Sequence, residues 1–155
     1  MSFDEDVPGV AARDAAVEQE RWDQENEAAA ARVPVVLKSP WYTYVVGEGV
    51  DVRRPGIYVW MIEGRGSYVG RYKSIVRPTR EYADTLRKML QEDRRRKATP
   101  GTYRRIHHEL KSAYEEMRPI TLTIRVNANA SDSERMEREL VAEYSAMGQS
   151  LNGPA

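Results

Sequence analysis

Residues 56–70 read GIYVWMIEGRGSYVG, and this stretch decides the fold. It contains two β-prone runs on either side of a short turn cluster with glycines at 64 and 66. Such a pattern predicts a β-hairpin. Because residues two apart in a strand share a face, Tyr58 and Tyr68 are expected to face each other on neighbouring strands if the turn sets that register.

Three helices are expected after the hairpin, because the apolar residues there recur with a helical period. Thr79 can cap the first helix, and Thr99-Pro100 opens the second with a proline in the first turn. The third is expected to begin at Ser131, where Ser-Asp-Ser-Glu matches a capping box with Glu134 reaching back. Gly148 is expected to end it.

Between the second and third helices, residues 120–126 alternate between apolar and polar and predict a half-buried strand. The chain therefore predicts an α+β fold with a small, mainly antiparallel three-stranded sheet flanked by helices, in the order β-β-α-α-β-α. Two short segments upstream, 35–37 and 42–46, are candidates for further strands.

The net charge of +0 conceals a segregation of charge along the chain. Residues 1–33 carry nine acidic and three basic side chains, a net of −6, so the rest carries +6. Residues 71–111 hold thirteen basic and five acidic side chains, which would supply the positive potential that phosphate binding needs. A solvated helical face is the other interpretation of the run at 94–97. We expect residues 1–33 to form an acidic arm, helical from about residue 14, and residues 34–155 to form one domain.

The chain contains no cysteine, so it has neither a disulfide framework nor a thiolate zinc site. Any metal would be held by oxygen or imidazole, which favours Mg²⁺ or Mn²⁺. No run approaches the roughly 18 apolar residues of a membrane span, and no signal-peptide pattern opens the chain. We expect no contact with a membrane and a cytoplasmic location, in a bacterial or phage-type host cell.

One carboxylate of the last expected helix lies on its apolar face. At about 100° per residue, Glu137 falls inside the arc that the apolar side chains define. These are Met136, Leu140, Val141, Tyr144 and Met147. An inward carboxylate is costly unless it is paired or bound to a metal, so Glu137 is either a metal ligand or the partner of a neighbouring arginine.

The pair of tripeptides, Gly-Ile-Tyr at 56–58 and Tyr-Val-Gly at 68–70, resembles the signature of the GIY-YIG nuclease family. The family pattern continues with a basic residue early in the next helix, a glutamate in a later helix and then an asparagine. All three are present in this order, and the resemblance covers about residues 54–153. It implies a GIY-YIG-like nuclease domain that hydrolyses DNA with one Mg²⁺ or Mn²⁺ ion.

The resemblance also implies a role for each matching residue. Glu137 would bind the metal, and Tyr58 would activate the attacking water directly or through a relay. Tyr68 would orient water or phosphate, and Asn152 would hold the site together through hydrogen bonds.

The catalytic arginine has two candidates, since Arg77 lies seven residues beyond Gly70 and Arg80 lies ten beyond it. Because Pro78 suggests a helix that starts at Thr79, we favour Arg80 for binding the phosphate and keep Arg77 as the alternative.

Four further side chains are expected to contact the substrate: Arg71, Lys73, Arg77 and His107. Cations next to the second tripeptide would favour the phenolate of Tyr58, whose ordinary pKa of about 10 makes it a weak base at neutral pH.

Two other classes of function remain open. The first is a catalytically inactive GIY-YIG-like module that binds nucleic acid without cutting it. The second is a protein-interaction domain that works through the acidic arm. If the chain is a nuclease, a homodimer or a partner protein would supply any specificity that this one domain lacks.

Overall fold

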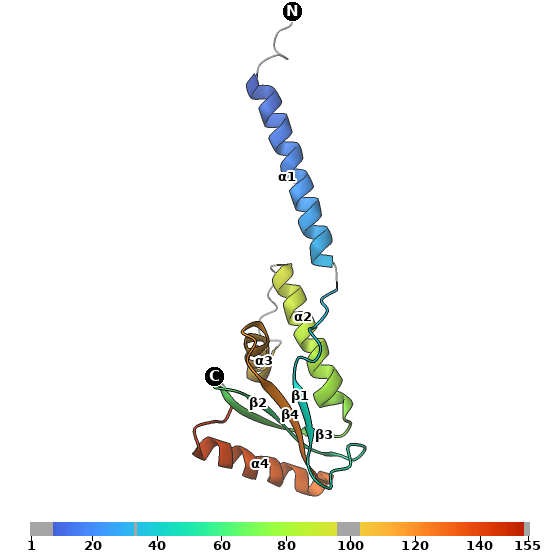
Figure 1. Cartoon of the computed structure of the whole chain (residues 1–155), viewed down its shortest axis with the longest axis vertical. Coiled ribbons are helices and arrows are strands. Elements are labelled where there is room, and N and C mark those ends of the chain that lie inside the picture. The colour runs from blue at the N-terminus through green and yellow to red at the C-terminus, as the bar shows by residue number, and fades with distance from the viewer. Residues whose placement is uncertain (1–7, 33, 96–102, 154–155) are drawn as a thin grey trace, which may run out of the picture.

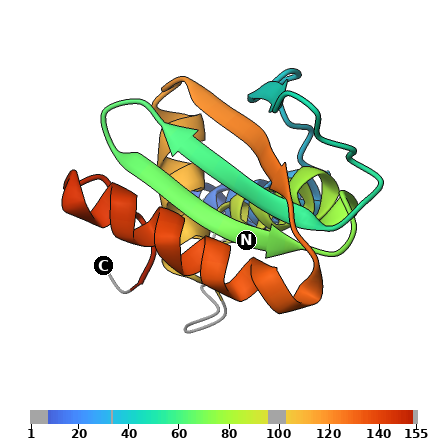
Figure 2. The same cartoon turned by 90° about the horizontal axis from the view of Figure 1, so that it is seen from below.

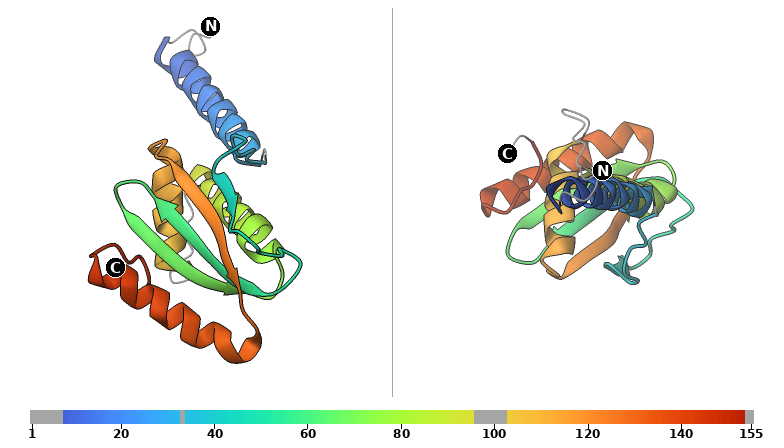
Figure 3. Two further views of the ribbon diagram at one scale, coloured as in Figure 1. Left: turned by 60° about the horizontal axis from the view of Figure 1, so that its bottom comes forward. Right: turned by 90° about the horizontal axis from the view of Figure 1, so that it is seen from above.

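The computed structural model describes residues 8–32, 34–95 and 103–153. Within them, α1 (Pro8–Arg32) is a single long helix that extends away from the rest of the chain (Figure 1, Figure 3). It begins before residue 14, where we expected it to start. The side chains of residues 13–29 are exposed, Trp22 among them, so the helix has no core of its own.

The sheet has four strands in the spatial order β1-β4-β2-β3. These are β1 (Thr43–Val46), β2 (Gly56–Ile62), β3 (Gly66–Tyr72) and β4 (Ile120–Asn127). β2 pairs antiparallel with both β3 and β4, whereas β1 pairs parallel with β4. The α+β class is confirmed, but the prediction of a three-stranded sheet was wrong because it left out the parallel edge strand.

The edge strand is anchored at its end and along the loop that follows it. The Gly47 N–H donates to the carbonyl oxygen of Ile124 at 2.8 Å. Further along, Asn127 accepts from the Asp51 N–H at 2.8 Å and donates to the Asp51 carbonyl oxygen at 2.8 Å. These contacts join segments more than seventy residues apart, so a local sequence pattern could not show that β1 pairs with β4. The other candidate strand, 35–37, is irregular in structure.

The helices follow the sheet strands in the expected order. A π-helical turn (Arg77–Glu81) leads into α2 (Tyr82–Arg94), which is followed by α3 (Arg105–Glu115), β4 and α4 (Ala130–Ala146). The start predicted for the second helix, at Thr99-Pro100, lies outside the described residues. In the described ranges, no helix is both long enough and apolar enough to cross a bilayer.

Two hydrophobic cores lie on opposite faces of the sheet (Figure 2). Tyr82 of α2 and Ile106 and Leu110 of α3 pack with Trp60 on one face. Trp60 is fully buried and stacks on Trp41 with 5.4 Å between ring centroids. Truncating a ring in such a core typically costs about 3–5 kcal/mol. The core therefore fixes the β2–β3 hairpin against the two helices.

On the other face, α4 packs its apolar side chains against Ile57, Val59 and Val69. Because side chains alternate along β2, Ile57 and Val59 point toward α4 while Tyr58 and Trp60 point toward α2 and α3. The first core thus holds Tyr58 against α2 and α3, and the second brings α4 alongside β3.

Two predicted helix starts were wrong. Thr79 does not cap a helix, because its Oγ1 donates to the Ile75 carbonyl oxygen at 2.6 Å inside the π turn. The last helix is capped by Asn129, two residues before Ser131, and the Asn129 Oδ1 accepts from the Asp132 N–H at 2.9 Å. Asparagine is as good an N-cap as serine, so the sequence offers two possible caps, Asn129 and Ser131, and the helix begins after the earlier one.

Candidate active site

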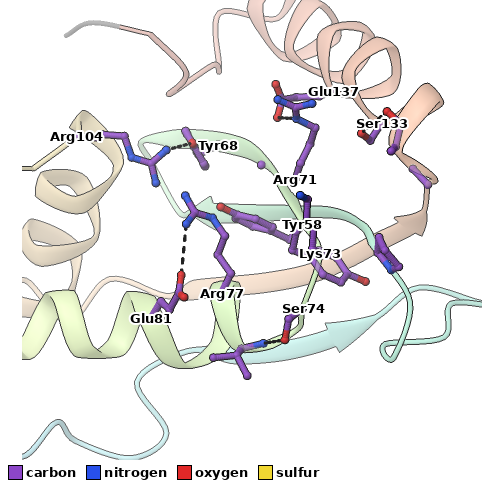
Figure 4. Close-up of a pocket in the computed structure, with 16 residues that line it drawn as sticks. Tyr58, Tyr68, Arg71, Lys73, Ser74, Arg77, Glu81, Arg104, Ser133 and Glu137 are labelled. Carbon is purple, nitrogen blue, oxygen red and sulfur yellow. Dashed lines mark hydrogen bonds and ion pairs between the residues drawn. The ribbon is translucent and has the colours of Figure 1, made fainter.

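A cavity of about 1140 Å³ opens where β3, the π turn and the start of α4 meet. Four cationic side chains line it, with the carboxylates of Glu81 and Glu137 as the acidic ones (Figure 4). The cations are Arg71, Lys73, Arg77 and Arg104. Since cations outnumber carboxylates two to one, the cavity favours an anionic ligand.

Tyr58 and Tyr68 lie on the same face of the hairpin, with 6.4 Å between their ring centroids. They are diagonal neighbours and not opposite each other, because Tyr58 pairs with Gly70 and Tyr68 pairs with Trp60. Gly70 leaves room for the Tyr58 ring, since a Cβ at Gly70 would lie 2.2 Å from the Tyr58 Cζ. The second tripeptide therefore ends in glycine for a packing reason.

The Tyr58 hydroxyl is hydrogen-bonded to the Tyr82 hydroxyl, with 2.6 Å between the two oxygens. Burial raises the pKa of Tyr58 above the ordinary value, and the neighbouring Tyr68 acts in the same direction. The Tyr82 hydrogen bond and the charges of Arg77 and Arg104 act against that rise in the pKa. We had expected cations next to the second tripeptide to favour the phenolate; the cations that lower the pKa are Arg77 and Arg104.

Arg104, which we did not predict, connects the tyrosines of the site. Its Nη1 donates to the Tyr68 hydroxyl at 2.9 Å and its Nη2 to the Tyr82 hydroxyl at 3.3 Å. With the Tyr58–Tyr82 bond, these contacts form one network that runs from Tyr58 to Tyr68. Only membership in the basic block at 71–111 marked Arg104 in the sequence. Tyr82 is 3% exposed, so its ring belongs to the core while its hydroxyl belongs to this network.

The structure brings Arg77, and not Arg80, to the cavity. The Arg77 side chain extends toward Tyr58 and donates to the Glu81 Oε2 at 3.3 Å (Figure 4). Arg80 is exposed and does not line the cavity. Our preference for Arg80 assumed a helix that starts at Thr79, whereas helical backbone begins at Val76 and passes through a π turn.

Glu137 lies at the cavity wall on α4 and forms an ion pair with Arg71, with 3.3 Å between Nε and Oε2 (Figure 4). The carboxylate is partly exposed, so in this structure it is the partner of an arginine, one of the two states expected for it. Arg71 also lines the cavity, as does Lys73, and both were expected to contact substrate.

The oxygen donors at this wall limit the kind of metal site that they can build. In the described ranges, no cluster of three or more acidic or histidine side chains could form a cage around an ion. Mg²⁺ commonly binds through one or two carboxylates and takes its other ligands from water and phosphate. Glu137, with the Ser133 hydroxyl one turn earlier in the same cavity, fits that open type of site.

Asn152 acts as a clamp on β3. Its Oδ1 accepts from the Val69 N–H at 2.9 Å, and its Nδ2 donates to the Val69 carbonyl oxygen at 2.9 Å. Val69 lies between Tyr68 and Gly70, so this pair of hydrogen bonds fixes the backbone on which the tyrosines are placed. The contacts agree with the expectation that Asn152 holds the site together.

His107 does not line the cavity, and its expected contact with substrate stays a prediction. It lies behind Tyr82, with 5.4 Å between the ring centroids, and its Nδ1 accepts from the Arg104 N–H at 3.1 Å. Burial, together with the charge of Arg104, lowers the pKa of His107 to about 4. His107 is therefore a neutral residue that positions Arg104.

Comparison of the chain with family models, with curated proteins and with solved structures finds no match.

Proposed function

We propose that this chain is a divalent-metal-dependent endonuclease that hydrolyses DNA phosphodiester bonds, as its resemblance to the GIY-YIG nucleases implies. The observation that carries the proposal is the convergence of Tyr58, Tyr68, Arg77 and Glu137 on one cationic cavity. These residues come from two strands, a π turn and the last helix, so the fold alone brings them together.

The reaction needs an activated water, neutralisation of the charge that develops on the phosphate, and stabilisation of the leaving oxygen. Arg77 and Lys73 are suited to bind the phosphate, because both line the cavity and are exposed to an incoming ligand. Tyr58 would take a proton from the attacking water. For this step Tyr58 must be in its phenolate form, and the 2.6 Å contact with the Tyr82 hydroxyl would hold the phenolate oxygen in place and stabilise it.

Glu137 is the proposed ligand of the metal, which when bound would supply charge neutralisation at the leaving oxygen. Tyr68 is held in place by Arg104 at 2.9 Å and would orient water or phosphate. Asn152 keeps β3 in position through its contacts with Val69.

A second candidate is the catalytically inactive module that binds nucleic acid. The Arg71–Glu137 ion pair favours it, because it occupies the carboxylate that a metal would need. The raised pKa of Tyr58 also favours it, since burial makes the phenolate harder to form. Both candidates share DNA as the partner. With either, a second copy or a partner protein would add specificity, and the cytoplasm of a bacterial or phage-type host is the proposed location.

Nicking of supercoiled plasmid in Mg²⁺ or Mn²⁺ separates the two candidates. The purified chain is compared with Glu137→Gln, with Glu139→Gln and with an EDTA control. Glu139 is a matched control because it lies on the same helix, is exposed and forms a similar ion pair with Arg135 at 3.2 Å. We expect wild type and Glu139→Gln to cut, and Glu137→Gln to be inactive.

Equal cutting by Glu137→Gln and wild type would contradict the assignment of the metal ligand. If no variant cuts plasmid or branched DNA in either metal while all still shift DNA on a gel, the binding module is the correct candidate.

A further inference from the structure

A second cavity, of about 520 Å³, adjoins the candidate active site. Tyr68 and Arg104 line both cavities, so they form the partition between the two. The Arg104 guanidinium carbon lies 5.8 Å from the centroid of the Tyr68 ring, and the Arg104 Nη1 donates to the Tyr68 hydroxyl. A ligand that passes the partition would therefore contact an aromatic face and a cation together.

The walls of this second cavity are fixed. One wall is formed by residues 151–153. The chain there is bonded to β3, because the Ser67 N–H donates to the Gln149 carbonyl oxygen at 2.7 Å and the Leu151 N–H donates to the Ser67 carbonyl oxygen at 2.8 Å. The other wall is the first turn of α3. Both walls belong to segments that the fold already holds in place, so the cavity exists before any ligand binds.

The lining combines an apolar floor with a polar rim. Ile106 and Leu151 supply the floor, and both are buried. Arg104, Arg105 and His108 form the rim. An apolar floor beside an aromatic ring suits the face of a nucleobase, and arginine at the rim suits the phosphate attached to it.

We propose that this second cavity takes one unpaired nucleotide of the DNA strand, next to the phosphate that lies in the first cavity. The inference rests on the proposed nuclease function and adds a substrate class to it, namely duplex DNA that carries an unpaired base. A base within a continuous stack cannot reach such a cavity without leaving the helix, and the energy of that step is lowest for a base that is already unpaired. Matched duplex is then the poorer substrate.

Fluorescence anisotropy in EDTA tests the proposal without requiring cleavage. Three labelled duplexes are compared: one fully matched, one with a single unpaired base, and one with an abasic site at the same position. Stacking of one base on an aromatic side chain predicts binding of the unpaired duplex that is about tenfold tighter than that of the matched one. The abasic duplex should bind like the matched one.

The variant is His108→Glu, which places a negative charge at the rim of the second cavity. His108 is exposed and lines only this cavity, so the change should not disturb folding or the first site. Lys88→Gln is the control, since it makes a comparable charge change at an exposed position of α2 that neither cavity includes. We expect His108→Glu to lose the tenfold preference and Lys88→Gln to keep it.

Equal binding of matched and unpaired duplexes by wild type would overturn the proposal. So would a preference that the abasic duplex retains, because the backbone alone would then be recognised, or a preference that His108→Glu leaves unchanged. Failure of the nuclease proposal is distinguishable, since it shows as absence of cutting with metal and leaves these binding ratios measurable.

Discussion

Replacing Gly70 with alanine should displace the Tyr58 ring without changing any charge. The added Cβ would lie 2.2 Å from the Tyr58 Cζ and 2.4 Å from its hydroxyl oxygen. Ordinary van der Waals contact begins at 3.4 Å, so the ring must shift by about 1.2 Å. Although these atoms are at the tip of a side chain, the ring is 1% exposed and its hydroxyl is hydrogen-bonded to Tyr82 at 2.6 Å, so a shift of the ring strains that hydrogen bond.

The loss of stability that this shift causes can be estimated from these contacts. Overpacking of a buried site costs about 1–3 kcal/mol, and the strained hydrogen bond to Tyr82 adds about 1 kcal/mol. Replacing a glycine within a strand by alanine by itself stabilises the folded state by about 0.5–1 kcal/mol. The expected net loss of stability is therefore about 1–3 kcal/mol, or a fall of roughly 2–12 °C in Tm for a chain of this length. A misplacement of about 1 Å in a catalytic group lowers turnover about 100-fold.

Thermal unfolding followed by circular dichroism measures the first quantity, and plasmid nicking measures the second. Tyr58→Phe is the matched control, because it removes the hydroxyl but keeps the ring in place. It should lose as much cutting as Gly70→Ala with a smaller fall in Tm. Wild-type stability and wild-type cutting in Gly70→Ala would refute the placement of Tyr58 at the active site.

Three further outcomes are expected. Arg77→Ala should lower the nicking rate about 10²–10³-fold, whereas Arg80→Ala should stay within a few fold of wild type; the reverse pattern would restore Arg80 as the catalytic arginine. Because burial raises the pKa of Tyr58, the nicking rate should still rise about tenfold per pH unit well above neutral pH, and a plateau near pH 7 would exclude its phenolate as the base. The pKa of His107 is lowered to about 4, so His107 stays neutral in the folded protein down to that pH. In the unfolded chain the same side chain takes up a proton below about pH 6.5. The free energy of unfolding should therefore fall as the pH drops from about 6.5 to 4. After discounting for partial exposure, His107→Gln should reduce that loss by about 1–2 kcal/mol in denaturant titrations, and an unchanged pH dependence would contradict the shift.

The parts of the fold that sequence reasoning found are those set by neighbouring residues. The hairpin, the order of the helices and the half-buried strand β4 each follow from a local period or turn. The parallel pairing of β1 with β4 was missed, because it depends on contacts such as that between Gly47 and Ile124. No local pattern says which strand an edge segment will join.

The candidate site divides in the same way. Glu137 could be found because it lies on the apolar face of the last predicted helix. Tyr58 and Tyr68 could be found from the two tripeptides that contain them. Arg104 could not, because its role comes from two hydroxyls that other elements carry to it. Tyr82 lies in the core, but its hydroxyl bonds to Tyr58, a contact that apolar periodicity does not report.

The structure places Arg77 and not Arg80 at the cavity for a reason that lies in the helix itself. Arg77 and Tyr82 are five residues apart, and in an α-helix that spacing would turn them about 140° away from each other. Both nevertheless act on Tyr58, Tyr82 through a 2.6 Å hydrogen bond and Arg77 through its charge. The π turn at residues 77–81 reconciles these facts, because its i→i+5 hydrogen bonds insert one residue per turn and bring the two side chains to one side. A period of 3.6 cannot detect this insertion. The site therefore depends on a backbone irregularity, and that is the kind of position at which regular patterning is expected to fail.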